Sequence, residues 1–316
     1  MFRAIQVAIV GILAVLSLTA TAQSFTPTTK PVEIVVPYPP GGATDKWARV
    51  LSEMLVNHGW QSVVVNRPGG DTIIGTNHVI HARPDGHTLL LGGNAMLGLG
   101  VDTDKVFAPV APLGAGTLVL VVNKDVPVNN YQEFKTYVKK NPEKFNLGFF
   151  NLYMSNLFYE WARKEKLPQP NVVIYKGSSP MIVDVVGGHI PFTIDTYTAI
   201  AQHAEAGKVK VIATLDLQGP AIVRRSQPVA KIPSLASANP LLDVSIWYGL
   251  YTPAGTPKDV VDQINTVVNQ GLKNPAQTKA IEQLHIYNFG GRPEDQKKIE
   301  TKTVNIMNTV IKNNSK

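Results

Sequence analysis

The amino-acid sequence predicts an α/β protein with two lobes. Short runs rich in valine and isoleucine alternate with amphipathic stretches, which is typical of a mostly parallel sheet covered by helices. Removal of the first 22 of the 316 residues would leave 294, which suits two domains of about 100 to 200 residues each. With 44% hydrophobic and 17% charged residues, the composition is ordinary for a globular protein with a buried core.

Residues 1–22 are predicted to be a cleaved export signal. Arg3 precedes an apolar run over 4–18, and residues 20–22 have the small-x-small pattern of a signal-peptidase site. A membrane anchor is the alternative, but the run is shorter than the roughly 20 apolar residues of a span. Because the chain has no cysteine, it can form neither a disulfide nor a lipoprotein anchor. We therefore expect the mature protein to be exported from the cytoplasm, and the family resemblance given below implies the periplasm.

Local patterns place the elements of the first part of the chain. Apolar residues recur at helical spacing from Trp47 to Leu55, and Gly59 can end that helix in the left-handed conformation. Runs of β-branched and other apolar residues between turn signals predict the strands. The expected strands lie at 32–36, 62–65, 87–91, 117–122, 172–175, 191–195 and 209–214.

Capping patterns place the later helices. Asn130 can cap a helix over 131–140, with Glu133 at the reciprocal position three residues on. Thr256 as N-cap, with Pro257 at the first helical position, predicts another helix start. Further helices are expected near 155–166, 179–186 and 197–206, and in two stretches at the end of the chain.

The stretch PYPPGGATDKW, residues 37–47, joins the first strand to the first helix. Its three prolines hold the chain extended as it leaves the sheet, and Gly41 and Gly42 let bare backbone approach a neighbour. The first N–H groups of the next helix lack internal partners and carry partial positive charge, so they can bind a carboxylate or phosphate. Thr44 and Asp45 could instead cap these groups, and the residues alone do not decide between the two interpretations.

The stretch VVIYKGSSPMIVDVVGG repeats this pattern in the second half of the chain. Gly177, Ser178 and Ser179 precede Pro180 at the first helical position and offer N–H and hydroxyl groups there. Ser179 could also be a simple N-cap. Ligands of open α/β sheets bind beyond the carboxyl ends of the strands, so two lobes that present such turns to each other would form a cleft.

Five stretches carry a family resemblance. They are VVPYPPGGATDKWARVLSEML, NRPGGDTIIGT, RPDGHTLLLG, VVIYKGSSPMIVDVVGGHI and WYGLYTPAGTPKDVVDQINTVVNQGLKNP, in this order over nearly the whole mature chain. Together they resemble the tripartite tricarboxylate transporter receptor family, the Bug-type periplasmic solute-binding proteins. The resemblance implies a hinged Venus-flytrap fold that delivers a small carboxylate to a membrane transporter with one large and one small subunit. It implies no cofactor, no metal and no nucleic acid, and we expect a monomer.

The resemblance also implies a set of site residues. In this family the turns that match 38–45 and 175–180 face each other and hold a ligand carboxylate largely by main-chain N–H groups and ordered waters. An acidic residue after a strand of the second lobe, here Asp195, also lies at the site, although Asp195 could equally cap the next helix. Lys176 matches a site position, but its side chain could instead be solvated. The residues expected at the site are Tyr38, Pro40, Gly41, Gly42, Thr44, Asp45, Phe150, Tyr153, Ser155, Lys176, Gly177, Ser178, Ser179 and Asp195.

The stretch LGFFNLYMSNLFYEW departs from the family, which usually has a Gly/Ser-rich loop there. It would place Phe149, Phe150, Tyr153 and Met154 beside the cleft. This predicts an apolar wall suited to an aromatic carboxylate, since each ring pair contributes about 0.5 to 1.5 kcal/mol. Because strand residues alternate faces, one of the two phenylalanines could belong to the core instead. Trp247 and Tyr248 are expected to pack inside the first lobe.

The resemblance divides the chain into lobe one, 23–122 plus 243–316, and lobe two, 123–242. The chain would pass between the lobes at about 117–124 and return at about 240–246. Rotation about these two crossing segments would close the cleft over a ligand.

The main alternative is an exported carboxylate-processing enzyme. The sequence contains no G-x-S-x-G elbow, no G-x-x-x-x-G-K phosphate loop and no H-E-x-x-H pair. His78 and His81 lie three apart on a predicted helix, but without a cysteine or a nearby carboxylate an exposed helix face is the better interpretation. The net charge of +7 comes from scattered basic residues, which favours a solvated surface over a nucleic-acid site. A receptor that feeds a sensor kinase would have the same fold and stays an open alternative.

Overall fold

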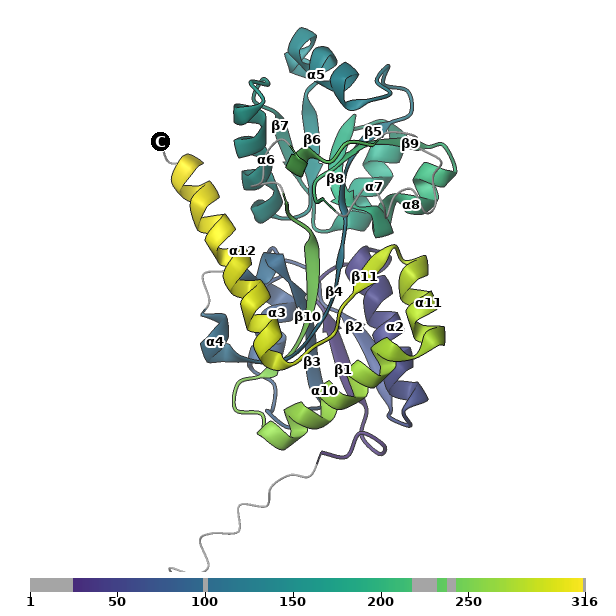
Figure 1. Cartoon of the computed structure of the whole chain (residues 1–316), viewed down its shortest axis with the longest axis vertical. Coiled ribbons are helices and arrows are strands. Elements are labelled where there is room, and N and C mark those ends of the chain that lie inside the picture. The colour runs from purple at the N-terminus through teal and green to yellow at the C-terminus, as the bar shows by residue number, and fades with distance from the viewer. Residues whose placement is uncertain (1–24, 99–101, 218–231, 238–242, 315–316) are drawn as a thin grey trace, which may run out of the picture.

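The computed structural model describes residues 25–98, 102–217, 232–237 and 243–314. It shows two lobes, one above the other in Figure 1, each with a central sheet flanked by helices. This arrangement confirms the predicted two-lobed α/β fold. The predicted export signal at 1–22 lies outside the described residues. Within them, no helix is both long and apolar enough to cross a membrane.

The first lobe is built on a six-stranded sheet in the order β11-β4-β10-β3-β1-β2. β1 pairs in parallel with β2 and β3, whereas β10 runs antiparallel to β3 and β4. The strands are β1 (Val32–Val36), β2 (Ser62–Asn66), β3 (Thr88–Gly93), β4 (Phe107–Gly116), β10 (Ile246–Pro253) and β11 (Ile286–Asn288). The helical elements are α2 (Ala43–Asn57), α3 (Ile73–Ile80), η1 (Asn94–Gly98), α4 (Thr103–Val106), α10 (Lys258–Lys273), α11 (Pro275–Gln283) and α12 (Pro293–Asn314).

The second lobe is built on a five-stranded sheet in the order β7-β6-β8-β5-β9. β6 pairs in parallel with β7 and β8, and β5 runs antiparallel to β8 and β9. The strands are β5 (Leu118–Asn123), β6 (Asn146–Phe149), β7 (Asn171–Ile174), β8 (Phe192–Thr196) and β9 (Val209–Thr214). The helical elements are α5 (Tyr131–Lys140), η2 (Pro142–Lys144), α6 (Leu152–Lys164), α7 (Ser178–Gly187), α8 (Tyr197–Glu205) and η3 (Leu235–Ser237).

The lobe boundary differs from the predicted one. Residues up to 122 were assigned to lobe one, but β5 hydrogen-bonds to β8 and β9 and is therefore a strand of the second sheet. The first crossing is Thr117, the single residue between β4 and β5. The return crossing was expected at about 240–246, and of this range only 243–246 is described. A short crossing of this kind lets the lobes rotate while each sheet stays intact.

Strand β4 has no counterpart among the predicted elements. Its prolines, Pro109 and Pro112, argue against a central strand because proline cannot donate to a ladder. In the structure both prolines pair with β10 beside register irregularities, which lie between Tyr248 and Gly249 and between Leu250 and Tyr251. At these points the regular ladder is already interrupted, so a missing N–H costs little.

The helix ends follow the capping patterns except at α7 and α10. Pro180 was predicted at the first position of its helix, but α7 begins at Ser178 with Gly177 as N-cap, so Pro180 is the third residue. Asn130 caps α5, because its side chain accepts from the N–H groups of Gln132 and Glu133, and Gly59 adopts φ +82° just beyond α2. The predicted cap Thr256 is wrong. Pro257 is the N-cap of α10, and the Thr256 hydroxyl donates to the Pro253 carbonyl at 2.8 Å instead.

The C-terminal helix α12 is fastened to the first sheet by buried hydrogen bonds. The Tyr251 hydroxyl donates to Glu300 at 2.5 Å and accepts from the Gln296 amide at 2.7 Å. The Trp247 indole N–H donates to the Thr303 hydroxyl at 2.8 Å. From this anchor α12 runs toward the second lobe, where it packs against α6 (Figure 1).

We expect Tyr251→Phe to lower the free energy of unfolding by about 1 to 3 kcal/mol, because Glu300 and Gln296 would lose a buried partner. Urea unfolding followed by circular dichroism measures this difference. Tyr137→Phe is the control, since it removes a hydroxyl for which the described residues provide no hydrogen bond. Equal losses in the two variants would contradict the anchoring role.

Candidate functional site

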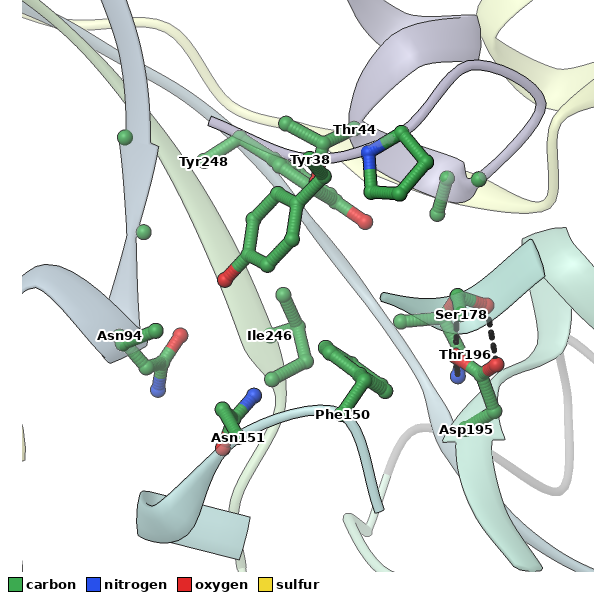
Figure 2. A pocket seen from close by; sticks show the side chains of 16 residues that line it. Tyr38, Thr44, Asn94, Phe150, Asn151, Ser178, Asp195, Thr196, Ile246 and Tyr248 are labelled. Atoms are coloured by element: carbon green, nitrogen blue, oxygen red, sulfur yellow. Dashed lines mark hydrogen bonds between the residues drawn. The ribbon is translucent and has the colours of Figure 1, made fainter. Parts of the chain in front are cut away.

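A pocket lies between the two lobes (Figure 2). It encloses about 540 Å³ of empty volume, including its opening to solvent. The first lobe contributes the start of α2, the end of β3 with η1, and β10, and the second contributes the ends of β6 and β8 and the start of α7. It is lined by Tyr38, Pro39, Gly42, Ala43, Thr44, Gly92, Gly93, Asn94, Ala95, Phe150, Asn151, Ser178, Asp195, Thr196, Ile246 and Tyr248.

The first turn leaves helix N–H groups free at the pocket. Asp45 is buried and does not cap α2; its carboxylate accepts from the Gly41 N–H at 2.9 Å and forms an ion pair with Arg49 at 3.0 Å. Gly41 has φ +90°, a conformation that favours glycine. Within the described part of the chain, no group accepts from the N–H of Gly42, Ala43 or Thr44. These three residues line the pocket, so their donors are available to a ligand.

The same network sets the charge state of Asp45. Burial alone would raise the pKa of its carboxyl, but hydrogen bonds from Arg49, Gly41 and Asn66, with the charge of Arg49, hold the pKa below its usual value. Asp45 therefore stays ionised at neutral pH and keeps the turn in place. The predicted site residue acts through the shape of the turn and does not line the pocket.

The second turn packs directly on the first. Gly177 is the N-cap of α7, and a Cβ at this position would lie 2.4 Å from Cδ of Pro39. The Ser179 hydroxyl donates to the Pro40 carbonyl at 2.8 Å. Only a glycine permits this approach, which brings the starts of α2 and α7 to one side of the pocket.

Further contacts join the lobes around the pocket. Lys46 Nζ donates to the Thr198 carbonyl at 3.1 Å, and the Leu152 N–H donates to the Asp71 carboxylate at 3.4 Å. The rings of Tyr38 and Phe150 meet edge to face, with centroids 6.0 Å apart. The two lobes are therefore closed on each other in this structure.

Asp195 is a buried carboxyl at the end of β8. It accepts hydrogen bonds from the Ser178 hydroxyl and from the Thr196 N–H. Burial raises its pKa to about 6, an effect that these hydrogen bonds and the charge of Lys46 oppose. Asp195 is therefore the one carboxyl of the pocket lining that can change its protonation near neutral pH.

The hydroxyl of Tyr248 is a second buried polar group at this end of the pocket. The side chain is 1% exposed, and no described residue forms a hydrogen bond with its Oη. Burial raises its pKa, and the Asp195 carboxyl adds to the effect. The hydroxyl is therefore protonated at neutral pH, and it can donate to a ligand.

The two adjacent phenylalanines are divided between pocket and core. Phe150 lines the pocket with Ile246 and Tyr38 (Figure 2). Phe149 is fully buried in the second lobe, where its ring lies 5.6 Å from that of Phe158. The strand ends at Phe149, so the two side chains leave it in different directions.

The structure brings only part of the predicted site set to the pocket. Tyr38, Gly42, Thr44, Phe150, Ser178 and Asp195 line it. The side chain of Tyr153 lies outside the described residues. Ser155 is buried and its hydroxyl donates to the Leu152 carbonyl, while Lys176 is exposed. Pro40, Gly41, Asp45, Gly177 and Ser179 shape the two turns without lining the pocket.

Several lining residues were not predicted. Tyr248 packs in the core as expected, but it also lines the pocket, which was not predicted. Asn94 follows β3, and the Gly-Gly-Asn sequence after a buried strand is the signal that could have identified it. Asn151 follows Phe150 and is the N-cap of α6, and an asparagine before a helix indicates a cap rather than a pocket residue.

A model of the tripartite tricarboxylate transporter family receptor matches residues 47–315. The chain belongs to this family. It is 30% identical to the protein BugT of Bordetella pertussis over 86% of each chain. These matches confirm the resemblance of the sequence to Bug-type receptors.

Solved structures agree with this assignment. The structure of the periplasmic binding protein BugD is 27% identical, with a TM-score of 0.76 over 89% of this chain and 95% of that one. A structure of an R. palustris protein with adipate is 26% identical, with a TM-score of 0.81 over 90% of this chain and 97% of that one. The fold is therefore that of periplasmic binding proteins. Among the described residues, no group of three or more His, Cys, Asp or Glu could hold a metal ion.

We expect the contribution of Asp195 to the stability of the ligand-free protein to fall as the pH rises from about 4 to about 6. The folded state holds the Asp195 proton more tightly than the unfolded state, so folding is favoured while the carboxyl is protonated and loses this advantage as the pH passes the folded pKa. Urea unfolding between pH 4.5 and 8 should show a loss of about 2 kcal/mol that is absent in Asp195→Asn. Asp125→Asn, at an exposed position, is the control and should follow the wild type. Parallel curves for wild type and Asp195→Asn would contradict this role.

Proposed function

We propose that this protein is a periplasmic receptor that captures a small carboxylate between its lobes and delivers it to a tripartite tricarboxylate-type membrane transporter. The observation that carries the proposal is the convergence of the α2 and α7 starts on one pocket, with the N–H groups of Gly42, Ala43 and Thr44 unused. The family of the chain supports the same function. Cleavage of residues 1–22 as an export signal belongs to this proposal.

The proposed negative charge of the ligand follows from the hydrogen-bond donors at the end of the pocket where Asp195 and the start of α2 lie. None of the described lining residues is a lysine, arginine or histidine. Helix N-termini bind anions through backbone donors and partial positive charge. The Tyr248 hydroxyl adds a donor on the same side, and a protonated Asp195 would add another. A single ligand carboxylate can satisfy these donors without a basic side chain.

The body of the ligand would lie on an apolar wall. Phe150, Ile246 and the ring of Tyr38 form this wall (Figure 2). It lies between the end of the pocket at Asp195 and the end at Asn94 and Asn151. A ring or a short alkyl chain would bury its surface there, and an aromatic ring would gain the edge or stacking contacts that aromatic pairs prefer. The related R. palustris protein was solved with adipate, so both aliphatic and aromatic acids belong in any ligand screen.

Closure of the lobes supplies the signal to the transporter. Contacts such as Ser179 to Pro40 and Lys46 to Thr198 form only when the lobes approach. A ligand held by groups of both lobes binds the closed form more tightly and shifts the population toward it. The closed surface is then the form that the membrane subunits recognise.

A thermal-shift screen of residues 23–316 tests this function. We expect carboxylates to raise the melting temperature by several degrees at millimolar concentration, because ligand binding to the folded state adds RT ln(1 + [L]/Kd) to stability. The panel comprises benzoate, 4-hydroxybenzoate, terephthalate, hexanoate, 6-hydroxyhexanoate, adipate, malate and glutamate, with the corresponding amides as uncharged controls. No shift with any acid, or equal shifts with acids and amides, would contradict the proposal.

We expect Gly42→Pro to weaken binding of the acid with the largest thermal shift at least tenfold, because proline lacks the N–H donor. Gly42 has φ −73°, which proline adopts, and a Cβ there would lie 3.6 Å from Cβ of Ser178, an ordinary contact. The fold should therefore tolerate the change. Isothermal titration calorimetry measures the affinity, and Gly42→Ala, which keeps the N–H, is the matched control. A folded Gly42→Pro protein with wild-type affinity would exclude this turn as a ligand contact.

A further inference from the structure

The interlobe pocket has a second polar end, opposite the Asp195 side. Figure 2 shows the hydroxyl of Tyr38 directed toward Asn94 and Asn151, away from Asp195. Phe150 and Ile246 lie between the two ends. A ligand whose carboxylate occupies the Asp195 side would therefore present its other end to Tyr38 and Asn151.

Asn151 is held so that its amide nitrogen faces the pocket. The residue is 1% exposed, and as N-cap of α6 its Oδ1 accepts from the Met154 N–H at 2.8 Å. The capping bond fixes which amide atom points to the helix, so Nδ2 must point the other way, into the pocket (Figure 2). No described residue accepts from this Nδ2. A buried donor without a partner is costly unless a ligand or water satisfies it.

Asn94 differs from Asn151 because both of its amide atoms are engaged. Its Oδ1 accepts from the Trp247 N–H at 3.0 Å, and its Nδ2 donates to the Ser245 carbonyl at 3.2 Å. Asn94 thus fixes the wall between η1 and β10. Asn151 and the Tyr38 hydroxyl are the two groups of this end that stay available to a ligand.

The charge around this end disfavours a second anion. The carboxylate of Asp71 already occupies the start of α6, where it accepts from the Leu152 N–H at 3.4 Å. After burial, the charges of Asp71 and Asp195 both raise the pKa of the Tyr38 phenol, so negative charge already acts on this hydroxyl. Lys46, the cation near Asp195, donates to the Thr198 carbonyl and does not line the pocket. A second carboxylate would lose its hydration beside Asp71 without gaining a cation.

We propose that Asn151 Nδ2 and Tyr38 Oη form a specificity subsite for an uncharged hydrogen-bond acceptor at the end of the ligand opposite its carboxylate. This proposal rests on the proposed function and narrows the ligand class. The preferred ligand is a monocarboxylate with an apolar middle and a hydroxyl or carbonyl oxygen at its far end. The chain should therefore discriminate against diacids of the same length.

Matched acids test the subsite by isothermal titration calorimetry at pH 8. One series is benzoate, 4-hydroxybenzoate and terephthalate, and the other is hexanoate, 6-hydroxyhexanoate and adipate. In at least one series we expect the hydroxy acid to bind at least tenfold more tightly than both the unsubstituted acid and the diacid. A diacid that binds more tightly than the hydroxy acid in both series overturns the proposal.

Two variants test the Asn151 amide donor and the Asp71 charge separately. Asn151→Ser keeps a capping oxygen for α6 but removes the amide donor, and we expect the advantage of the hydroxy acid over the unsubstituted acid to shrink to less than threefold. Asp71→Asn should improve diacid binding relative to the hydroxy acid at least fivefold. Asparagine tolerates the φ of +50° at position 71, so we expect the Asp71→Asn variant to fold like the wild type.

Asn130→Ser is the matched control, because it makes the same chemical change at the N-cap of α5. It should leave every affinity unchanged. If Asn151→Ser retains the full wild-type ratio, the subsite proposal is overturned while the receptor function stands. If no acid of either series binds to wild type, the proposed function itself is overturned, so the two failures are distinguishable.

Discussion

The contact between Gly177 and Pro39 is the constraint on which the rest of the pocket depends. A side chain at position 177 would collide with the proline ring, so the two turns reach each other only because one of them has no Cβ. This approach places the starts of α2 and α7 at one end of a single pocket, although they belong to different sheets. This convergence of helix starts is therefore a property of the closed pair of lobes. Neither lobe has it alone.

The described lining of the pocket contains no basic side chain, and two acidic residues act on it in different ways. Asp45 turns away from the pocket into a network with Gly41, Arg49 and Asn66, which leaves the N–H groups at the start of α2 unconsumed. Asp195, in contrast, is buried in the lining, and burial raises its pKa to about 6, so its carboxyl can gain or lose a proton near neutral pH. Asp45 thus leaves the backbone donors of α2 free, whereas Asp195 can change its protonation state.

Closure also depends on how the chain crosses between the lobes. Thr117 joins two strands that belong to different sheets, and β10 lies next to β4 in the first sheet, close to this crossing. The register irregularities between β4 and β10 accommodate two prolines there. Helix α12 is anchored to the first sheet by Tyr251 and Trp247 and packs against α6 of the second lobe, so its contact with α6 is sensitive to lobe rotation.

The sequence by itself determined seven of the strands, namely β1, β2, β3, β5, β7, β8 and β9, together with the cap at Asn130 and the two glycine-containing turns, because these depend on patterns within a few residues. It also carried the family resemblance, since the motifs follow one another along the whole chain. Only the tertiary structure decided that β4 is a strand despite its prolines, that β5 belongs to the second sheet, and that Phe150 rather than Phe149 faces the pocket. The positions of Tyr248 and Asn151 at the pocket likewise depend on how two segments that are distant in the sequence pack together. A pattern within a few residues carries no information about such packing.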